Sequence, residues 1–389
     1  MRICVLGGAG KMGCVAVQAL AQDERVDHVL LLDVNLDQAR LVADFIKSPK
    51  VSVQPVDLGQ RDRLVLALAG ADACLNATNY YTNMLVMEGC LAAGAHYVDL
   101  GGLFHMTRQQ LALDERFAAQ GLSAILGMGT APGIPNVQAR YAADGLDTVE
   151  SIKIYDGVEP APSHAPLFTY AIPTILDELT LEPVVFTNGE FVARLPLSDF
   201  EDVCFTHPLG VLPMHLSLHS EVATLPITYH DKGIRECFFK INYWGMSRQV
   251  VEKLRVLVEL GFDRREPVEV GGTKVIPREV MQALLSGYVP PISYYLTPSE
   301  RQPPDWNQEI VSEVRGTKAG RPITYRVGTL TCKRGEPTGL AAAIAAVWLA
   351  EGRIKPGVHP PEAVVEPEPF FKELEAEEIY TQVSVSSML

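Results

Sequence analysis

The glycine-rich segment near the amino terminus constrains the fold more than any other feature of the chain. In "GGAGKMG", residues 7–13, three glycines follow the spacing G-x-G-x-x-G. This spacing alone also fits a tight turn rich in small residues, so the neighbouring segments must distinguish a cofactor loop from a simple turn. A short apolar segment, 2–6, precedes it, and segment 11–22 carries an apolar stripe at helical spacing. The pattern predicts strand, turn and helix, the first part of a dinucleotide-binding unit.

Each glycine has a different expected role. Gly8 permits the tight turn, Gly10 lets the backbone approach a pyrophosphate, and Gly13 lets the helix pack closely on the strand. The backbone N–H groups at the start of the helix, around Lys11 and Met12, then face the anion. We therefore expect these five residues to bind the cofactor.

A second apolar segment, 28–33, ends at Asp33, 20 residues after Gly13. A carboxylate at this place is expected to hold a ribose 2′-hydroxyl. It would repel a 2′-phosphate, so the sequence favours NAD over NADP. Arg40, seven residues further on, leaves NADP as the alternative.

Apolar strands and helices continue to alternate up to about residue 130. The expected strands are 2–6, 28–33, 51–56, 73–78, 97–100 and 122–127, and the expected helices are 11–22, 36–46, 61–69, 83–94 and 108–120. This alternation predicts an α/β fold with a parallel, Rossmann-type sheet. Ligands of such sheets lie at the carboxyl ends of the strands. Further cofactor contacts are therefore expected from Thr78, Asn79, Tyr80, Gly101, Gly129 and Thr130.

The pattern changes after "GMGTAPGIPN", residues 127–136. Long extended segments follow at 149–155, 183–196 and 232–244, interrupted by one helical segment, 247–261. Asn188–Gly189 is a typical hairpin turn. We expect an α+β region with a mostly antiparallel sheet.

The length of 389 residues favours two domains. The strongly apolar helical segment 338–352 is expected to return to the first domain and cover it. The predicted organisation is a discontinuous Rossmann domain (1–133 and 335–375), a second, α+β domain (134–334) and a C-terminal tail (376–389). The family resemblance described below implies that the second domain serves substrate binding and dimerisation.

Composition excludes several classes of function. The net charge of −14 argues against a nucleic-acid partner. No apolar run is long enough to span a membrane, and no signal peptide is expected. The seven cysteines form no C-x-x-C pair, so neither a zinc site nor a disulfide framework is indicated. A cytoplasmic protein without a bound metal is expected.

Four side chains are candidate catalytic groups. Asp99 ends a predicted strand on the ligand side of the sheet, although it could instead cap the following turn. His215, His219 and Glu221 occur together in "MHLSLHSEV", with His207 and Lys240 as further candidates. The prolines at 208 and 213 oppose a long helix, which argues against metal ligation by this group.

Four segments resemble the saccharopine dehydrogenase-like family, especially its lysine 6-dehydrogenase branch. They are "GGAGKMG", "NATNYYTNMLVMEGCLAAGAHYVDLGG" (76–102), "QQLALDERFAAQGLSAILGMGTAPGIPN" (109–136) and "TGLAAAIAAVWLAEGRIKPGVHPPEA" (338–363). The resemblance implies an NAD(P)-dependent enzyme acting on a carbon–nitrogen bond of an amino acid, with a discontinuous Rossmann domain. It also implies a homodimer formed through the sheet of the second domain. Lysine-oxidising members tend to carry an Asp-Gly pair where this chain has Glu221–Val222, so lysine is not assigned as the substrate.

The resulting hypothesis is hydride transfer from an amine-bearing carbon to a nicotinamide, followed by hydrolysis of the imine. A free alkylamine has a pKa near ~10.4, so a base must first remove its proton. Two alternatives remain open at this point. One is a reductase of another carbonyl, imine or enoyl group, and the other is a non-catalytic NAD-sensing protein.

Overall fold

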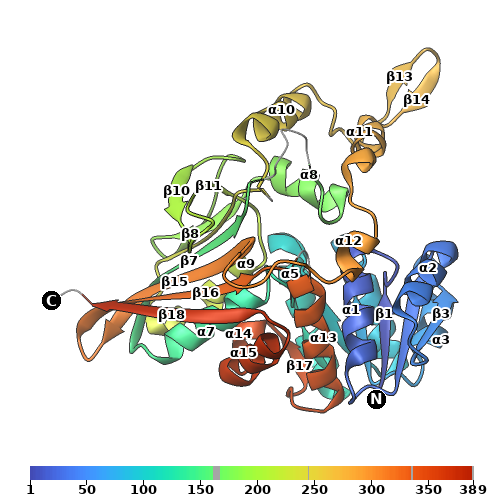
Figure 1. Cartoon of the computed structure of the whole chain (residues 1–389), viewed down its shortest axis with the longest axis horizontal. Coiled ribbons are helices and arrows are strands. Elements are labelled where there is room, and N and C mark those ends of the chain that lie inside the picture. Colours follow the sequence, from blue (N-terminus) through green and yellow to red (C-terminus); the bar gives the residue numbers. More distant parts are fainter. Residues whose placement is uncertain (161–166, 244, 334–335, 388–389) are drawn as a thin grey trace.

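The computed structural model describes residues 1–160, 167–243, 245–333 and 336–387. In this part of the chain the six strands expected before residue 130 lie in one parallel sheet, toward the right of Figure 1. A seventh strand, β17 (Gly357–His359), completes this sheet. Their order across the sheet is β17, β6 (Ser123–Ile125), β5 (His96–Asp99), β4 (Ala73–Asn76), β1 (Arg2–Leu6), β2 (His28–Asp33) and β3 (Val51–Pro55). The predicted Rossmann-type sheet is therefore confirmed.

Helices cover both faces of this sheet. They are α1 (Lys11–Gln22), α2 (Leu36–Ile46), α3 (Arg61–Leu68), α4 (Asn83–Ala93), α5 (Leu103–Leu111), α6 (Asp114–Ala119) and α13 (Glu336–Ala350). The single helix predicted over 108–120 is two helices. Asp114 starts the second one, and its carboxylate accepts a hydrogen bond from the Val358 N–H of β17 at 2.7 Å.

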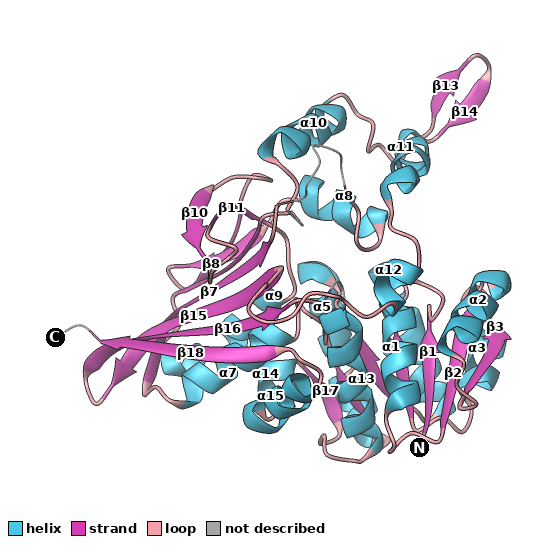
Figure 2. Cartoon of the chain, viewed as in Figure 1, coloured by secondary structure: helices cyan, strands magenta, loops and turns pink. Residues whose placement is uncertain are grey.

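The second sheet is mixed, with antiparallel pairs predominating (Figure 2). Its path runs through β10 (Glu201–Cys204), β11 (Val211–Leu216), β12 (Glu236–Ile241), β7 (Thr148–Val158), β15 (Gln308–Lys318), β16 (Arg321–Thr331) and β18 (Tyr380–Ser387). Only the β12–β7 pair along this path is parallel among the described residues. The side hairpin of β8 (Val184–Thr187) and β9 (Glu190–Ala193) turns at Asn188 and Gly189, whose φ angles are 53° and 88°. That hairpin was predicted from the Asn-Gly pair.

Helices outside the first domain fall into two groups. One group, α7 (Ile134–Asp144), α9 (Glu221–Thr228), α14 (Pro361–Val364) and α15 (Pro367–Ala376), lies beside the second sheet. The other group lies toward the top of Figure 1 and comprises α8 (Ile172–Thr180), α10 (Arg248–Glu259), the β13–β14 hairpin (Val268–Val270 and Thr273–Val275) and α11 (Pro277–Leu285), followed by α12 (Ser293–Leu296), which packs against α1. Apart from α10, the sequence reasoning did not anticipate this second group.

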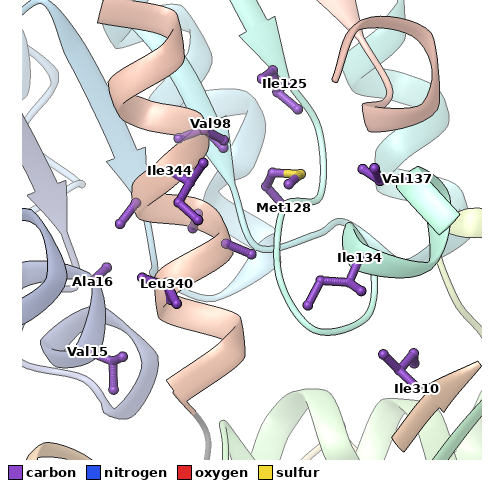
Figure 3. Packing of buried hydrophobic residues seen from close by; sticks show 14 of the residues in the cluster. Val15, Ala16, Val98, Ile125, Met128, Ile134, Val137, Ile310, Leu340 and Ile344 are labelled. Carbon is purple, nitrogen blue, oxygen red and sulfur yellow. The ribbon is translucent and has the colours of Figure 1, made fainter. Parts of the chain in front are cut away.

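The apolar helix α13 lies inside the first domain. Leu340 and Ile344 face Val15 of α1 on one side and Val98 of β5 on the other (Figure 3). Burying an aliphatic side chain of this size contributes about 1.5–3 kcal/mol, so this contact holds the returning chain firmly on the sheet. The strand that follows, β17, then extends the first sheet through its pairing with β6.

The carboxyl-terminal residues 376–389 were expected to form a tail. Instead, Tyr380–Ser387 form β18, which pairs with β16 at the edge of the second sheet. The alternating sequence "YTQVSVSS" fits an extended strand, a pattern that the tail interpretation overlooked. The expected boundary between residues 334 and 335 lies outside the described residues. Across the described chain, no helix is both long and apolar enough to cross a membrane.

Candidate functional site

The glycine turn joins β1 to α1. Gly7, to which the sequence analysis assigns no role, makes the turn with a φ of +72°. Gly8 packs against Leu31 instead, and a Cβ added to Gly8 would lie 2.7 Å from the Leu31 Cγ. A Cβ on Gly13 would come within 2.1 Å of the Gly7 carbonyl oxygen, so only glycine allows α1 to start this close to the turn. A Cβ on Gly10 would meet only that same oxygen, at 3.1 Å. The turn role predicted for Gly8 therefore belongs to Gly7.

The start of α1 fits a diphosphate. Its first helical hydrogen bond runs from the Cys14 N–H to the Gly10 carbonyl, so the N–H groups of the first turn have no partner within the helix. Gly10, Lys11 and Met12 all line a cavity. A dinucleotide phosphate held there would accept hydrogen bonds from these N–H groups and be favoured by the helix dipole.

Asp33 stands at the end of β2 beside this turn. Its carboxylate accepts hydrogen bonds from the Ala9 N–H at 3.1 Å and from the Asn35 N–H at 2.9 Å. It therefore fixes the glycine turn as well as presenting a charge at the end of the strand. Arg40 lies on the exposed side of α2, 3.8 Å from Asp37.

The cavity has a volume of about 580 Å³ and is lined by both parts of the molecule. Of the predicted cofactor residues, eight line it: Gly10, Lys11, Met12, Thr78, Asn79, Tyr80, Gly101 and Thr130. The other four, Gly8, Gly13, Asp33 and Gly129, lie outside the lining. The second domain contributes residues from β7, α8, β12, β15 and the segment before α9.

Two buried carboxylates face this cavity from the second domain. Asp156 of β7 accepts a hydrogen bond from Gln308 Nε2 at 2.8 Å. Glu178 of α8 accepts one from the Tyr170 hydroxyl. Burial is the main cause that raises the pKa of Asp156 to about 6 and the pKa of Glu178 to about 7. Neither residue was identified from the sequence, because a lone acidic residue in a strand or helix carries no distinguishing pattern.

His219 lines the same cavity, and Glu221 supports it from behind. The ring of His219 stacks on Phe239 with 3.8 Å between centroids, and its Nδ1 is hydrogen-bonded to Glu221. Burial lowers the pKa of His219, but the Glu221 carboxylate, helped by Glu178 and Asp156, outweighs burial and raises it. Of the four predicted catalytic residues, only His219 contacts the cavity directly.

Asp99 does not reach the cavity, and the structure supports its alternative role. Its carboxylate is buried and accepts hydrogen bonds from five groups: Tyr97 OH, Gln110 Nε2, Asn83 Nδ2, and the N–H groups of Gly101 and Gly127. These bonds use the lone pairs of both oxygens. Asp99 therefore fixes the turns after β5 and β6, as in the alternative considered from the sequence, and its catalytic role stays a prediction.

His215 is also placed away from the cavity. It lies on β11 opposite Ile241 of β12, and its ring faces Phe200 and Tyr243 at centroid distances of 5.3 and 6.0 Å. Burial lowers its pKa. Of the two histidine candidates, His219 lines the cavity and His215 does not.

The other two histidine-region candidates also lie elsewhere. Lys240 is paired with Glu201, and His207 is exposed on the loop between β10 and β11. In the described part of the chain, no group of three or more His, Cys, Asp or Glu side chains has a geometry that could hold a metal ion.

A second cluster of hydrogen bonds, centred on the buried Asp177, connects the first domain to α8 beside the cavity. Asp177 of α8 is fully buried and accepts hydrogen bonds from Arg278 at 2.6 Å, Arg265 at 2.8 Å and the Tyr80 hydroxyl at 2.8 Å. Tyr80 follows β4 in the first sheet. The predicted cofactor residue Tyr80 therefore also holds α8 in place.

Two family models together match nearly the whole chain. Residues 3–125 match the saccharopine dehydrogenase NADP binding domain, and residues 129–379 match the saccharopine dehydrogenase C-terminal domain. The first match indicates a nicotinamide cofactor and agrees with the glycine turn described above.

Curated relatives are similar over most of their length. The chain is 27% identical to the carboxyaminopropylagmatine dehydrogenase of Synechocystis sp., with 94% of both chains covered. It is 24% identical to the carboxynorspermidine synthase of Vibrio cholerae, with 72% of this chain and 71% of the relative covered. Among solved structures, an L-Glu-forming saccharopine dehydrogenase from Saccharomyces cerevisiae shares the fold, with a TM-score of 0.69, 16% identity and 99% of each chain covered.

Proposed function

This chain belongs to the saccharopine dehydrogenase family, and we propose that it oxidises or forms a carbon–nitrogen bond of a carboxylated polyamine. The observation that carries the proposal is the pair of buried carboxylates, Asp156 and Glu178, in the cavity that begins at the glycine turn. The names of two curated relatives denote polyamine derivatives with an added carboxyl group, which supports the same substrate class.

The acidic pair favours a substrate that carries positive charge. A buried carboxylate without a cation beside it is costly, which is why the pKa values of Asp156 and Glu178 are raised. A substrate ammonium or guanidinium placed between them would restore both charges and form charge-assisted hydrogen bonds. A neutral substrate would leave that cost in place.

His219 is the proposed acid–base group. Its Nδ1 is held by Glu221, which leaves Nε2 to exchange a proton with the reacting nitrogen. In the oxidative direction the substrate amine must lose its proton before hydride can leave its carbon, and His219 takes that proton. A nicotinamide dinucleotide held at the start of α1 by Gly10, Lys11 and Met12 would supply the redox chemistry, as acceptor or donor of the hydride. Water then adds to the imine carbon, which releases a carbonyl compound and an amine.

Two finer points belong to the same proposal. Asp33 supports NAD as the cofactor because a 2′-phosphate would meet its negative charge, although the matching family model is named for NADP. Oxidation of lysine, as in the lysine 6-dehydrogenase branch, is the second candidate. The acidic pair would also suit the side-chain ammonium of that amino acid.

A substrate panel tests the assignment. The purified chain is incubated with NAD or NADP and, separately, a carboxylated polyamine, lysine, saccharopine, glutamate or a 2-hydroxy acid, and the reduced-nicotinamide absorbance is followed. We expect turnover with the carboxylated polyamine. Turnover only with amino acids would contradict the polyamine assignment, and turnover only with a hydroxy acid would contradict the carbon–nitrogen assignment.

Matched variants connect the activity to the acidic pair. Asp156→Asn and Glu178→Gln each remove one charge at nearly constant volume, and both should raise KM for the polyamine about tenfold or more. Glu252→Gln removes an exposed carboxylate on α10 and should leave KM unchanged. Equal KM values for all three variants would show that Asp156 and Glu178 do not bind the substrate.

We also propose that the chain forms a homodimer through the second sheet. Its edge strand β18 exposes Val383 and Val385, and an exposed apolar edge favours pairing with another strand. Light scattering of the full chain and of a Val383→Lys variant tests this. A monomeric parent chain would rule it out.

A further inference from the structure

Lys11 joins the cofactor turn to a segment of the second domain. It is the first residue of α1, and its Nζ donates hydrogen bonds to the carbonyl oxygens of Phe168 at 3.1 Å and Tyr170 at 2.6 Å. A lysine ammonium has three donors, and these bonds use two of them. Lys11 also lines the cavity, beside the first-turn N–H groups suited to a phosphate.

The position of this cation is unfavourable without an anion. The N-terminal end of a helix already carries partial positive charge, so a lysine at this end of α1 adds repulsion. Burial adds a further cost and lowers the pKa of Lys11 to about 8. The two carbonyl dipoles offset only part of this cost, whereas a dinucleotide phosphate would bring full negative charge.

The segment that Lys11 contacts forms one wall of the cavity. Residues 167–171, which we call the wall segment, include Leu167, Thr169, Tyr170 and Ala171 of the cavity lining. The Tyr170 hydroxyl donates to Glu178, and the Thr169 carbonyl accepts from the Tyr295 hydroxyl at 2.8 Å. Tyr170 thus contacts Lys11 through its carbonyl oxygen and a carboxylate of the proposed substrate site through its hydroxyl.

We propose that Lys11 is a positioning residue that couples dinucleotide binding to the wall segment. With a phosphate at the start of α1, the ammonium donates to the phosphate and to the Phe168 and Tyr170 carbonyls together. The wall segment becomes more tightly held, and Tyr170 keeps Glu178 oriented for the cationic substrate. The inference rests on the proposed function for the identity of the substrate, but its first step needs only a dinucleotide.

Hydrogen exchange of the full chain tests this step without any turnover. Backbone exchange of peptides that cover residues 167–171 is measured with and without saturating NADH, and again with NADPH. We expect the better-binding dinucleotide to slow exchange in this segment. Calorimetry in parallel gives the affinity.

Two variants of Lys11 and one matched control separate coupling from folding. Lys11→Met removes the charge and the donors, and it should weaken dinucleotide binding about tenfold or more. At saturation it should show no slowing of exchange in the wall segment. Lys11→Arg keeps the charge and should recover most of the affinity. If Lys11→Met does not fold, Lys11→Gln provides the same comparison with a neutral, polar side chain.

Lys232→Met is the matched control. Lys232 also donates to two backbone carbonyls, those of Ala143 at 2.6 Å and Leu146 at 2.8 Å, but it lies outside the cavity lining. This variant should bind the dinucleotide like the parent chain and show the same slowing of exchange. Such a result supports a role specific to Lys11.

Three results would overturn the inference in distinguishable ways. Equal slowing of exchange in the parent chain and in Lys11→Met would show that Lys11 does not transmit the effect. Binding to the parent chain without any slowing would show that the wall segment does not respond. Failure of the parent chain to bind either dinucleotide would instead overturn the proposed function, and this inference with it.

Discussion

The side chains of His219 and Glu221, two residues apart in the chain, form a buried hydrogen bond. The His219 Nδ1 contacts one carboxylate oxygen, and the ring lies flat on Phe239. Among the described residues, the other oxygen of Glu221 has no hydrogen-bond partner. The carboxylate therefore acts mainly on His219, whose charged form it stabilises.

Replacing Glu221 with Gln should lower the pKa of His219, because the opposite charge that outweighs burial is lost. The His219 resonance, followed by NMR across a pH series, should titrate at lower pH than in the parent chain. With an amine substrate, the acidic limb of the rate profile should move in the same direction, and turnover should fall about a hundredfold. An unchanged His219 titration would mean that Glu221 does not control its charge.

The acidic pair predicts that stability depends on pH. Glu178 has a raised pKa of about 7 in the folded protein, so the folded state holds its proton more tightly than the unfolded state does. Its contribution to stability is complete below pH ~4.5 and is lost as the pH rises through about 7, with a slope of at most roughly 1.4 kcal/mol per pH unit.

Denaturant unfolding across this pH range measures the effect. The difference in unfolding free energy between Glu178→Gln and the parent chain should shift in favour of the variant as the pH rises. A difference that does not vary with pH would show that Glu178 titrates normally. Glu252→Gln, which changes an exposed carboxylate, should show no such trend.

The glycine turn allows a test that separates binding from folding. Gly10→Val places a side chain beside the cavity, and its Cβ would meet only the Gly7 carbonyl oxygen, at 3.1 Å, so the change should abolish dinucleotide binding and leave the melting temperature nearly unchanged. Gly13→Ala places a Cβ 2.1 Å from that oxygen and should lower stability by about 1–3 kcal/mol. Calorimetry and thermal unfolding of both variants decide between these effects. A Gly10→Val variant that binds the dinucleotide with the affinity of the parent chain would show that the turn has only a structural role.

Asp99→Asn should affect stability more than chemistry. The single NH₂ group of an asparagine would face donors that now contact one carboxylate oxygen, either Gln110 on Oδ2 or the Gly127 N–H on Oδ1. Leaving buried donors unpaired should lower the unfolding free energy by about 2–3 kcal/mol. Activity per folded molecule should change little, since Asp99 does not line the cavity. A variant that is stable but inactive would show that Asp99 takes part in catalysis.

The first domain could be predicted almost completely from the sequence because local patterns determine it. Each buried strand is a short apolar run, each helix has apolar residues at helical spacing, and the glycine spacing marks the turn. The hairpin at Asn188–Gly189 was predictable for the same reason, since its φ angles favour those two residue types.

The candidate site was less predictable because it depends on contacts between distant segments. Asp156 and Glu178 become a pair only when β7 and α8 come together in the folded second domain, and neither has a local signal. His215 and His219 are close in sequence, yet β11 directs the first toward Phe200 and away from the cavity. Asp99 has the position of a catalytic residue, but five surrounding donors satisfy it. Tertiary contacts decide each of these cases.

Asp33 carries the remaining question, the choice between NAD and NADP. Asp33→Ser removes the charge that would repel a 2′-phosphate, and it also weakens the bond to the Ala9 N–H. The preference for NAD over NADP, measured as the ratio of dissociation constants, should fall by about 1–3 kcal/mol, or roughly five- to 150-fold. Asp37→Ser removes an exposed carboxylate on the neighbouring helix and is the matched control, with no change expected. If the ratio is the same in Asp33→Ser and the parent chain, repulsion at Asp33 does not select the cofactor. Arg40→Ala then becomes the variant to measure, because Arg40 is the single Lys or Arg residue within α2.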